Sequence, residues 1–123
     1  MKKFTDSHEW IVMETPEIGR VGITQYAQKE LGDIVYVELP KEESLVNAGQ
    51  EAVVLESTKA AADVYSPVSG KIISVNTLLK QSPELVNQAC ETDGWLFKIQ
   101  ILNAAEVDQL MDLQAYEAML NGA

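Results

Sequence analysis

The run from Trp95 to Ile101 is the sequence feature that most constrains the fold. Its odd-numbered positions, Trp95, Phe97, Ile99 and Ile101, are all apolar. Side chains at every second position share one face of a strand, so this run is predicted to be a strand with one buried face. A strand buries such a face by joining a sheet, which directs attention to further strand signals.

Several other short segments also have strand character. Trp10–Met13 and Arg20–Ile23 flank the turn-prone segment 15–19, a pattern typical of a β-hairpin. Ile34–Leu39 is rich in β-branched residues and is stopped by Pro40. These signals predict a mainly β fold.

Helix signals are short. Thr24 is suited to cap a helix that runs to Leu31, and Gly32 is suited to end it. Ser82–Glu84 has the form of a further helix start, with proline at the first helical position.

The C-terminal segment 103–122 changes to helical periodicity. Asn103 and Glu106 have the spacing of a capping box, and Asp112 is suited to cap a last helix that ends before Gly122. Its inward residues are predicted to be Tyr116, Met119 and Leu120. We expect these helices to pack on the core rather than to bind a partner.

The charge balance limits the partners. The chain of 123 residues has 19 acidic and 9 basic residues, for a formal net charge of −10. Nucleic acid and anionic membrane surfaces require a basic face, so we expect neither as a partner. An acidic surface favours solubility and also steers a protein toward basic patches on partners.

Few residue types suited to catalysis or metal binding are present. The single cysteine, Cys90, excludes an internal disulfide and a CxxC site, and the single histidine, His8, excludes a multi-histidine metal site. We expect His8 to pack or to hydrogen-bond rather than to catalyse. Segment 1–6 has two lysines but no apolar stretch behind them, so it is not a secretory signal, and the chain is expected to be cytoplasmic.

A weak internal repeat surrounds the segment that carries the chemistry. Segments 47–54 and 68–73 share a glycine turn, a polar residue and paired apolar residues, which suits a small β-barrel or sandwich. Between them, small and polar residues predict a tight turn at 57–60, with Lys59 near the tip of a hairpin. By these signals alone, Lys59 is better interpreted as a solvated surface lysine, because most lysines are exposed and have no special role.

The segment ESTKAAADVYSPVSG, which contains Lys59, resembles the lipoyl-attachment segment of glycine cleavage H proteins. Four further stretches resemble the same family in the same order and with similar spacing. They are HEW at 8–10, VGIT-YAQ--LGDIVYVELP at 21–40, PELVN up to Asn87 and GWLFKI at 94–99. The resemblance covers nearly the whole chain.

The residues beside the lysine separate this family from near relatives. Biotin carriers usually have Met on both sides of the lysine, and lipoyl domains of 2-oxoacid dehydrogenases typically have Asp-Lys-Ala. Thr58 and Ala60 fit neither pattern. Thr58 replaces the usual Val with a residue of similar volume. Segment 90–93 replaces the usual Pro-Tyr and acidic residues, which leaves partner affinity open.

The resemblance implies a barrel-sandwich hybrid, a flattened β-barrel with short helices, in a single domain over residues 1–123 on which segment 103–122 packs. It implies a non-catalytic carrier with lipoate attached covalently to Lys59 by a ligase or a lipoyl or octanoyl transferase. Such a carrier shuttles an aminomethyl group and reducing equivalents between glycine decarboxylase, a tetrahydrofolate-dependent aminomethyltransferase and dihydrolipoamide dehydrogenase.

The family pattern also suggests roles for other residues. Glu56 and Gly70 match positions read during lipoylation, with Gly70 shaping a turn at the far side of the hairpin. Glu9, Asp63 and Glu30 match a cleft that shelters the loaded arm, where their carboxylates would hold an ammonium; an alternative is that they are ordinary surface acids. Two alternative functions remain: a lipoyl depot that supplies 2-oxoacid dehydrogenases, and an unmodified interaction protein.

Overall fold

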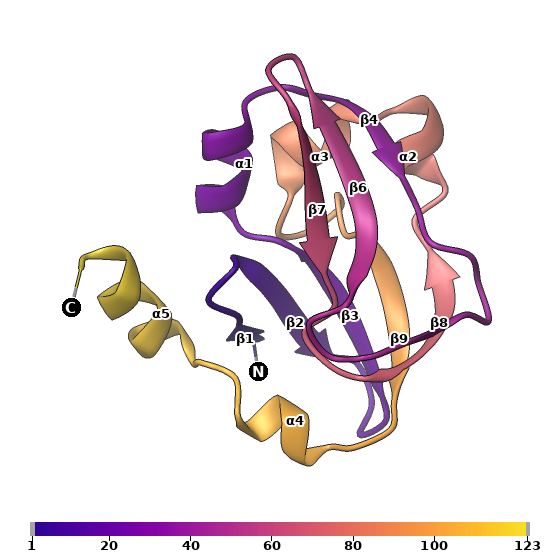
Figure 1. The fold of residues 1–123 in the computed structure, drawn as a ribbon, viewed down its shortest axis with the longest axis vertical. Coiled ribbons are helices and arrows are strands. Elements are labelled where there is room, and N and C mark those ends of the chain that lie inside the picture. Colours follow the sequence, from indigo (N-terminus) through magenta and orange to yellow (C-terminus); the bar gives the residue numbers. More distant parts are fainter. Residues whose placement is uncertain (1, 123) are drawn as a thin grey trace.

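A computed structural model describes residues 2–122, and within them the strands form two antiparallel sheets (Figure 1). The larger sheet has the order β1 (Lys2–Phe4), β2 (Glu9–Met13), β3 (Ile18–Ile23), β9 (Phe97–Ile101), β8 (Gly70–Val75) and β5 (Leu45–Val46). The smaller sheet has the order β4 (Ile34–Glu38), β6 (Glu51–Ser57) and β7 (Ala61–Tyr65). The predicted mainly β, two-sheet architecture is confirmed, and in the described residues the two sheets do not close into one barrel.

The main core consists of aliphatic side chains from both sheets together with Phe97. Ile11, Ile72 and Ile99 of the larger sheet and Leu55 of the smaller one are fully buried in a single cluster. On β9 the predicted alternation is confirmed, because Phe97 and Ile99 are buried while Lys98 and Gln100 are not. Burial of these aliphatic side chains at about 25 cal/mol per Å² provides the main force that holds the two sheets together.

A second, smaller cluster lies on the other face of the larger sheet. It contains Phe4, Trp10 and Tyr116, and Trp10 is completely buried although its neighbour Ile11 points into the main core. Strand β2 is therefore covered on both faces. Gly22 lies directly opposite Trp10, and a Cβ atom there would come within 2.6 Å of the indole ring, so the glycine makes room for it.

The helices are short and occupy the connections. They are α1 (Gln25–Leu31), α2 (Leu78–Gln81), α3 (Glu84–Ala89), α4 (Ala105–Asp108) and α5 (Leu113–Leu120). Both predicted ends of α1 are confirmed: Thr24 Oγ1 accepts a hydrogen bond from Ala27 N, and Gly32 ends the helix with φ of +83°. Asp112 caps α5 in the same way, through a bond of 2.8 Å from Ala115 N.

Two local predictions are wrong. Glu106 does not form a capping box with Asn103, because its carboxylate accepts hydrogen bonds from Ser69 N and Oγ at 2.7 and 3.1 Å. Leu120 is not inward but 37% exposed, because α5 contacts the body mainly through Tyr116. The predicted proline start of α3 is confirmed, because Pro83 has the helical dihedral angles φ of −61° and ψ of −21° directly before Glu84.

The two segments of the internal repeat differ in structure. Gly49 lies in a turn with φ of +81°, where nothing would contact an added Cβ atom. Gly70 is instead the first residue of β8, paired with Val46 and Ile101, and a Cβ atom there would collide with the Gln100 carbonyl oxygen. Gly70 therefore does not shape a turn but lets β9 approach closely.

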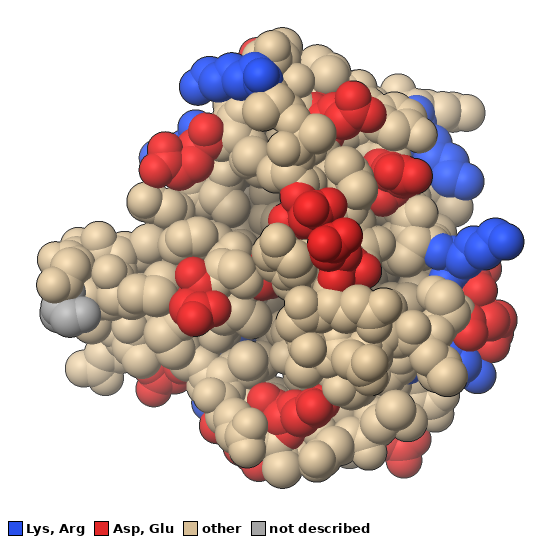
Figure 2. All heavy atoms as spheres, viewed as in Figure 1, with Lys and Arg blue, Asp and Glu red and all other residues tan. Residues whose placement is uncertain are grey.

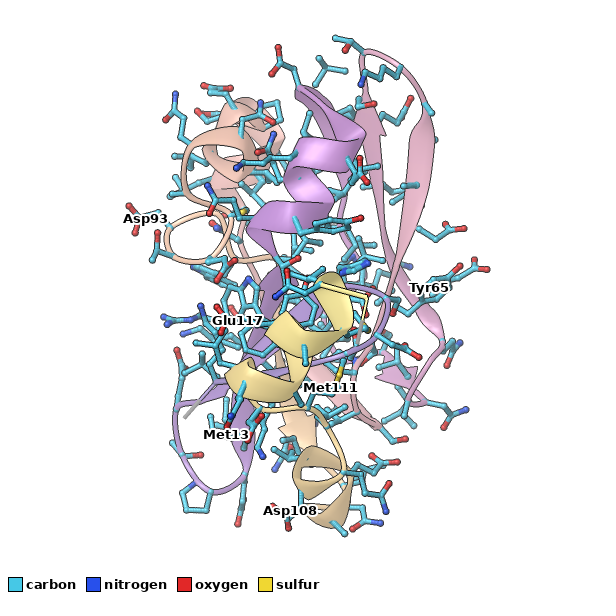
Figure 3. All side chains as sticks on the ribbon, turned by 90° about the vertical axis from the view of Figure 1, so that its left-hand side faces the viewer. Met13, Tyr65, Asp93, Asp108, Met111 and Glu117 are labelled. Carbon is cyan, nitrogen blue, oxygen red and sulfur yellow. The ribbon has the colours of Figure 1, made fainter. Side chains whose placement is uncertain are left out.

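The C-terminal segment follows the larger sheet across its outer face (Figures 1 and 3). In Figure 3, α5 lies in front of the sheet and below α1, with Met111 at the link between α4 and α5. Met111 also pairs with Phe4 through two backbone hydrogen bonds of 2.8 and 2.9 Å. Within residues 2–122, no helix is both long and apolar enough to cross a membrane. The outermost residues of the predicted domain, 1 and 123, lie outside the described part.

The Glu106 contact predicts a specific loss of stability. Glu106→Ala leaves Ser69 N without its carboxylate partner, and we expect unfolding to cost about 1–2 kcal/mol less. Asp108→Ala on the same helix is the matched control, because Asp108 is exposed, and it should change stability by less than about 0.5 kcal/mol. Urea denaturation measures both, and equal effects would contradict the assignment.

Candidate functional site

Lys59 lies in the tight turn that joins β6 to β7, as the sequence predicts. Ser57 organises this turn: its backbone N–H donates to Ala60 O at 2.8 Å, and its Oγ accepts from Lys59 N and Ala60 N at 3.1 Å each. The turn projects at one end of the molecule (Figure 1), and Lys59 is exposed there. The lysine is thus held at the backbone while its side chain stays accessible.

The turn is attached to the junction between α1 and β4. Thr58 N donates to Asp33 O at 3.0 Å, and β4 begins opposite Ser57. The Lys59 side chain extends over Gly32, where an added Cβ atom would lie 3.5 Å from Lys59 Cε. Gly32 also has a positive φ, so a side chain there would strain the backbone, although its Cβ atom would make only ordinary contact with the lysine.

Asn87 on α3 holds this junction in place. Its Oδ1 accepts hydrogen bonds from Ile34 N at 2.8 Å and Gln28 Nε2 at 3.3 Å, and its Nδ2 donates to Ile34 O at 3.3 Å. Gln28 Nε2 in turn donates to Gly32 O at 3.2 Å. Sequence reasoning did not identify Asn87 or Gln28 as site residues, although both lie in stretches that resemble the H-protein family, Gln28 in VGIT-YAQ and Asn87 in PELVN.

A cavity of about 190 Å³ opens between α1 and β7, next to this junction. Its walls come from Tyr26, Glu30 and Leu31 of α1 and from Ala62–Val64 of β7, and Ser7, His8 and Glu9 also line it. Glu9, Glu30 and Asp63, the three carboxylates that the sequence assigned to one cleft, therefore line the same cavity. Leu31, one of these lining residues, directly precedes Gly32, over which the Lys59 side chain extends.

Glu9 differs from the other two carboxylates. It is only 2% exposed and accepts hydrogen bonds from Thr5 Oγ1 at 2.5 Å, Ser7 Oγ at 2.6 Å and Tyr65 N at 3.3 Å. Burial raises the pKa of the Glu9 carboxyl above its ordinary value, and these hydrogen bonds only partly oppose the increase. Glu9 is therefore not an ordinary surface acid.

Glu30 and Asp63 are exposed, in contrast to Glu9. The Glu30 carboxylate beside the Tyr26 hydroxyl raises the pKa of that phenol. Both carboxylates remain available at the mouth of the cavity, and together with Glu9 they give it a negative character suited to a cationic group.

The two residues assigned to recognition during lipoylation lie far apart along the hairpin. Glu56 is exposed and adjoins the turn, where it pairs with Ala61 across the hairpin. Gly70 is buried beyond the opposite end of β7, where it packs against β9. Only Glu56 is placed for direct contact with a protein that approaches Lys59.

Several acidic side chains lie on the face that carries the hairpin. Figure 2 shows them gathered over the middle of the view, where β6 and β7 lie in Figure 1. Exposed acids on this sheet are Glu38, Glu51, Glu56 and Asp63, and the ion pairs seen among the described residues involve other carboxylates. The Lys59 side chain is therefore a positive group at the end of an acidic face.

Within residues 2–122, no cluster of three or more potential metal ligands is present. Cys90 is a buried thiol, and burial together with the neighbouring Glu91 carboxylate raises its pKa to about 11, so it is a poor nucleophile. Chemically, the arrangement offers an accessible lysine amine and, beside it, a small acidic cavity.

Comparison with known proteins shows the family to which the chain belongs. The family model described as Glycine cleavage H-protein matches residues 2–123. The chain belongs to the glycine cleavage H-protein family. A glycine cleavage system H protein from Pectobacterium carotovorum is 49% identical over 118 residues, covering 96% of this chain and 91% of the relative.

Other family members are similar in sequence and in structure. The corresponding protein of Rhodospirillum rubrum is 48% identical over 117 residues, covering 95% of this chain and 93% of the relative. The crystal structure of a glycine cleavage system H protein from Mycobacterium marinum superimposes with a TM-score of 0.87 at 35% identity, covering 99% of this chain and 97% of that one. Members of the glycine cleavage H-protein family are non-catalytic lipoyl carriers, and this chain has that role in glycine cleavage.

Because Asn87 supports the junction to which the Lys59 turn is attached, we expect the turn to become more mobile when the Asn87 hydrogen bonds are removed. Asn87→Ala leaves Ile34 N and O without their side-chain partners, and we expect a destabilisation of about 1–3 kcal/mol. Hydrogen exchange at Thr58 N should also accelerate, because its acceptor Asp33 precedes Ile34. The exposed Gln88 on the same helix supplies the control Gln88→Ala. Unchanged exchange at Thr58 would show that Asn87 does not support the turn.

The buried Glu9 carboxyl predicts a pH dependence of stability. Because its pKa is higher in the folded than in the unfolded protein, the folded state binds more protons between the two values. The stability that protonated Glu9 contributes is fully present below the ordinary carboxyl pKa. It is lost as the pH rises through the higher pKa of Glu9 in the folded protein. Urea denaturation across this range should show the decline in the wild type but not in Glu9→Gln. Identical pH profiles would contradict it.

Proposed function

We propose that Lys59 is the residue that carries the lipoyl group. The observation that supports this assignment best is the position of the lysine: it lies exposed in a hydrogen-bonded turn and extends over Gly32, which directly follows Leu31 in the wall of the acidic cavity. Lipoate joined to Lys59 by an amide would supply a dithiolane that accepts the aminomethyl group and carries two reducing equivalents. The small neighbours Ala60–Ala62 leave room for an attaching enzyme.

The residues present fit such a group. A lipoyllysine side chain reaches on the order of a dozen Å from the backbone, judged from its bond count. Ala62, which lines the cavity, is three residues beyond Lys59, and at about 3.3 Å per extended residue this places the cavity wall within that reach. The arm can therefore dock in the cavity of its own carrier or swing outward, and tethering keeps its effective concentration high at either site.

Glu9, Glu30 and Asp63 would serve the docked state. Glu30 and Asp63 at the mouth would attract a cationic amine at the end of the arm, and the buried Glu9 would add negative potential from the floor. Because Glu9 already accepts three hydrogen bonds, we assign direct contact first to the two exposed carboxylates.

The acidic face supports the choice of partners. We infer that the carrier meets glycine decarboxylase, aminomethyltransferase and dihydrolipoamide dehydrogenase through basic surfaces around their active sites, in the cytoplasm. Exposed acids beside the turn would speed these encounters, and added salt should weaken them, which binding measured at two ionic strengths tests. We propose that the lipoylating enzyme recognises Glu56, which adjoins the turn. Gly70 affects lipoylation only through its effect on the fold. We further propose that the chain is a single domain that includes segment 103–122.

Lipoylation in vitro tests the assignment of Lys59. After incubation with lipoate, ATP and a lipoate ligase, intact mass should increase by one lipoyl group, and peptide mapping should place it on Lys59. Lys59→Arg should remain unmodified, whereas Lys80→Arg, a change at another exposed lysine, should react like the wild type. No modification under conditions that modify a known lipoyl domain would favour an unmodified interaction protein.

The same assay tests Glu56 separately. Glu56→Ala should lower the initial rate of lipoylation, because it removes the exposed carboxylate next to the turn, and Glu51→Ala, at the other end of β6, is the matched control. Equal rates for the two variants would exclude Glu56 as a recognition residue.

A further inference from the structure

His8 is the only histidine of the chain, and it occupies an unusual place. It lines the cavity between α1 and β7, and its ring lies against Tyr26 with the ring centroids 4.6 Å apart. Its φ of +72° lies in the left-handed region, which costs a residue with a Cβ atom free energy. The surrounding contacts must therefore hold this residue in place.

The C-terminal helix provides the main contact. Tyr116 of α5 is only 4% exposed, and its ring stacks on Phe4 with centroids 4.7 Å apart. Its hydroxyl oxygen lies 2.8 Å from His8 Nδ1 and 2.7 Å from Thr24 Oγ1. One side chain of α5 thus joins the cavity histidine to the residue that caps α1.

The direction of these hydrogen bonds follows from the Thr24 hydroxyl. Thr24 is 1% exposed, and its oxygen already accepts a hydrogen bond from Ala27 N. Within the described residues, its hydrogen has the Tyr116 oxygen as its partner, and a buried hydroxyl requires one. Thr24 therefore donates to Tyr116, and Tyr116 donates to His8 Nδ1. In the neutral ring the hydrogen is then on Nε2.

His8 Nε2 is free to bind. It makes no hydrogen bond to residues 2–122, and it is not a buried atom, since the one buried side-chain N or O atom without a partner in that range is Arg20 Nε. The carboxylates of Glu9, Glu30 and Asp63 in the same cavity are acceptors. His8 adds a side-chain donor to a cavity whose charged groups are all acceptors.

We propose that His8 donates a hydrogen bond from Nε2 to a sulfur atom of the docked lipoyl arm, with Tyr116 as its positioning residue. The inference rests on the proposed attachment at Lys59. The thiolate form of a reduced sulfur is a hydrogen-bond acceptor that three nearby carboxylates would repel, and a donor at this position offsets the repulsion. The carboxylates and His8 together suit an arm that bears an amine and a sulfur side by side.

The unmodified protein gives the first test. A long-range ¹H–¹⁵N spectrum contains one imidazole, and in the wild type we expect the neutral ring to carry its hydrogen on Nε2. Tyr116→Phe retains the stacking on Phe4 but removes the hydroxyl, and it should abolish this preference. Tyr36→Phe, at an exposed tyrosine, should leave the spectrum unchanged. A wild-type ring with hydrogen on Nδ1 would overturn the proposal.

The reduced lipoylated protein gives the second test. The His8 ring nitrogens should shift when the arm is reduced, and a thiol-alkylating reagent should react more slowly in His8→Ala. If loss of the donor raises the thiol pKa by about one unit, the alkylation rate near neutral pH falls about threefold, because fewer thiolates are partly offset by greater nucleophilicity. The buried Cys90 thiol, with a pKa of about 11, does not compete.

His8→Gln separates hydrogen bonding from structure. Glutamine imposes the same backbone strain as alanine at this φ but retains an N–H donor, so its alkylation rate should return toward that of the wild type. Equal rates in His8→Ala and the wild type, or ring nitrogens that do not respond to reduction, would overturn the proposal. Intact mass, recorded first, shows whether the arm is attached, so failure of the proposed function is recognised separately.

Discussion

The hydrogen bond from Thr58 N to Asp33 O fixes the lysine turn against the body, and the arrangement of the site depends on it. A two-stranded hairpin end is only marginally stable by itself, and its tip would otherwise move freely. With the turn attached to the α1–β4 junction, Lys59 extends over Gly32 and the wall of α1 lies beside β7. The cavity exists because this junction keeps helix and hairpin at a fixed distance.

Hydrogen bonds from α3, and not apolar packing alone, hold that junction in place. Asn87 satisfies both the N–H and the C=O of Ile34, at the point where the chain passes from a helix into a strand. Neither backbone group would otherwise have a partner in regular structure, and leaving such groups unpaired is costly. A single amide side chain on α3 therefore determines the geometry of a turn on the opposite side of β4.

Much of the fold follows from the sequence, because its signals are local. The alternation on β9, the cap at Thr24 and the stop at Gly32 each depend on a few neighbouring residues. Predictions failed where a distant partner took precedence. Glu106 has the spacing of a capping box, but the backbone N–H of Ser69, 37 residues earlier, competes for the same carboxylate. Gly70 looks like a turn glycine, but the approach of Gln100 on β9 is what requires it.

In the candidate site, too, the features with local sequence signals were predictable and those that depend on distant contacts were not. Lys59 was predictable from its turn and its motif, and Glu9, Glu30 and Asp63 from the family pattern alone. The burial of Glu9 and the contact from Tyr116 to His8 were not predictable, since each joins segments far apart in the chain.

These long-range contacts explain why a carrier without catalytic groups needs the whole chain. The exposed lysine requires only a hairpin, whereas the sheltered cavity requires α1, β2, β7 and α5 together, because α5 holds His8 and the cap of α1 through one hydroxyl group. Displacement of α5 would therefore release both His8 and the residue that caps α1.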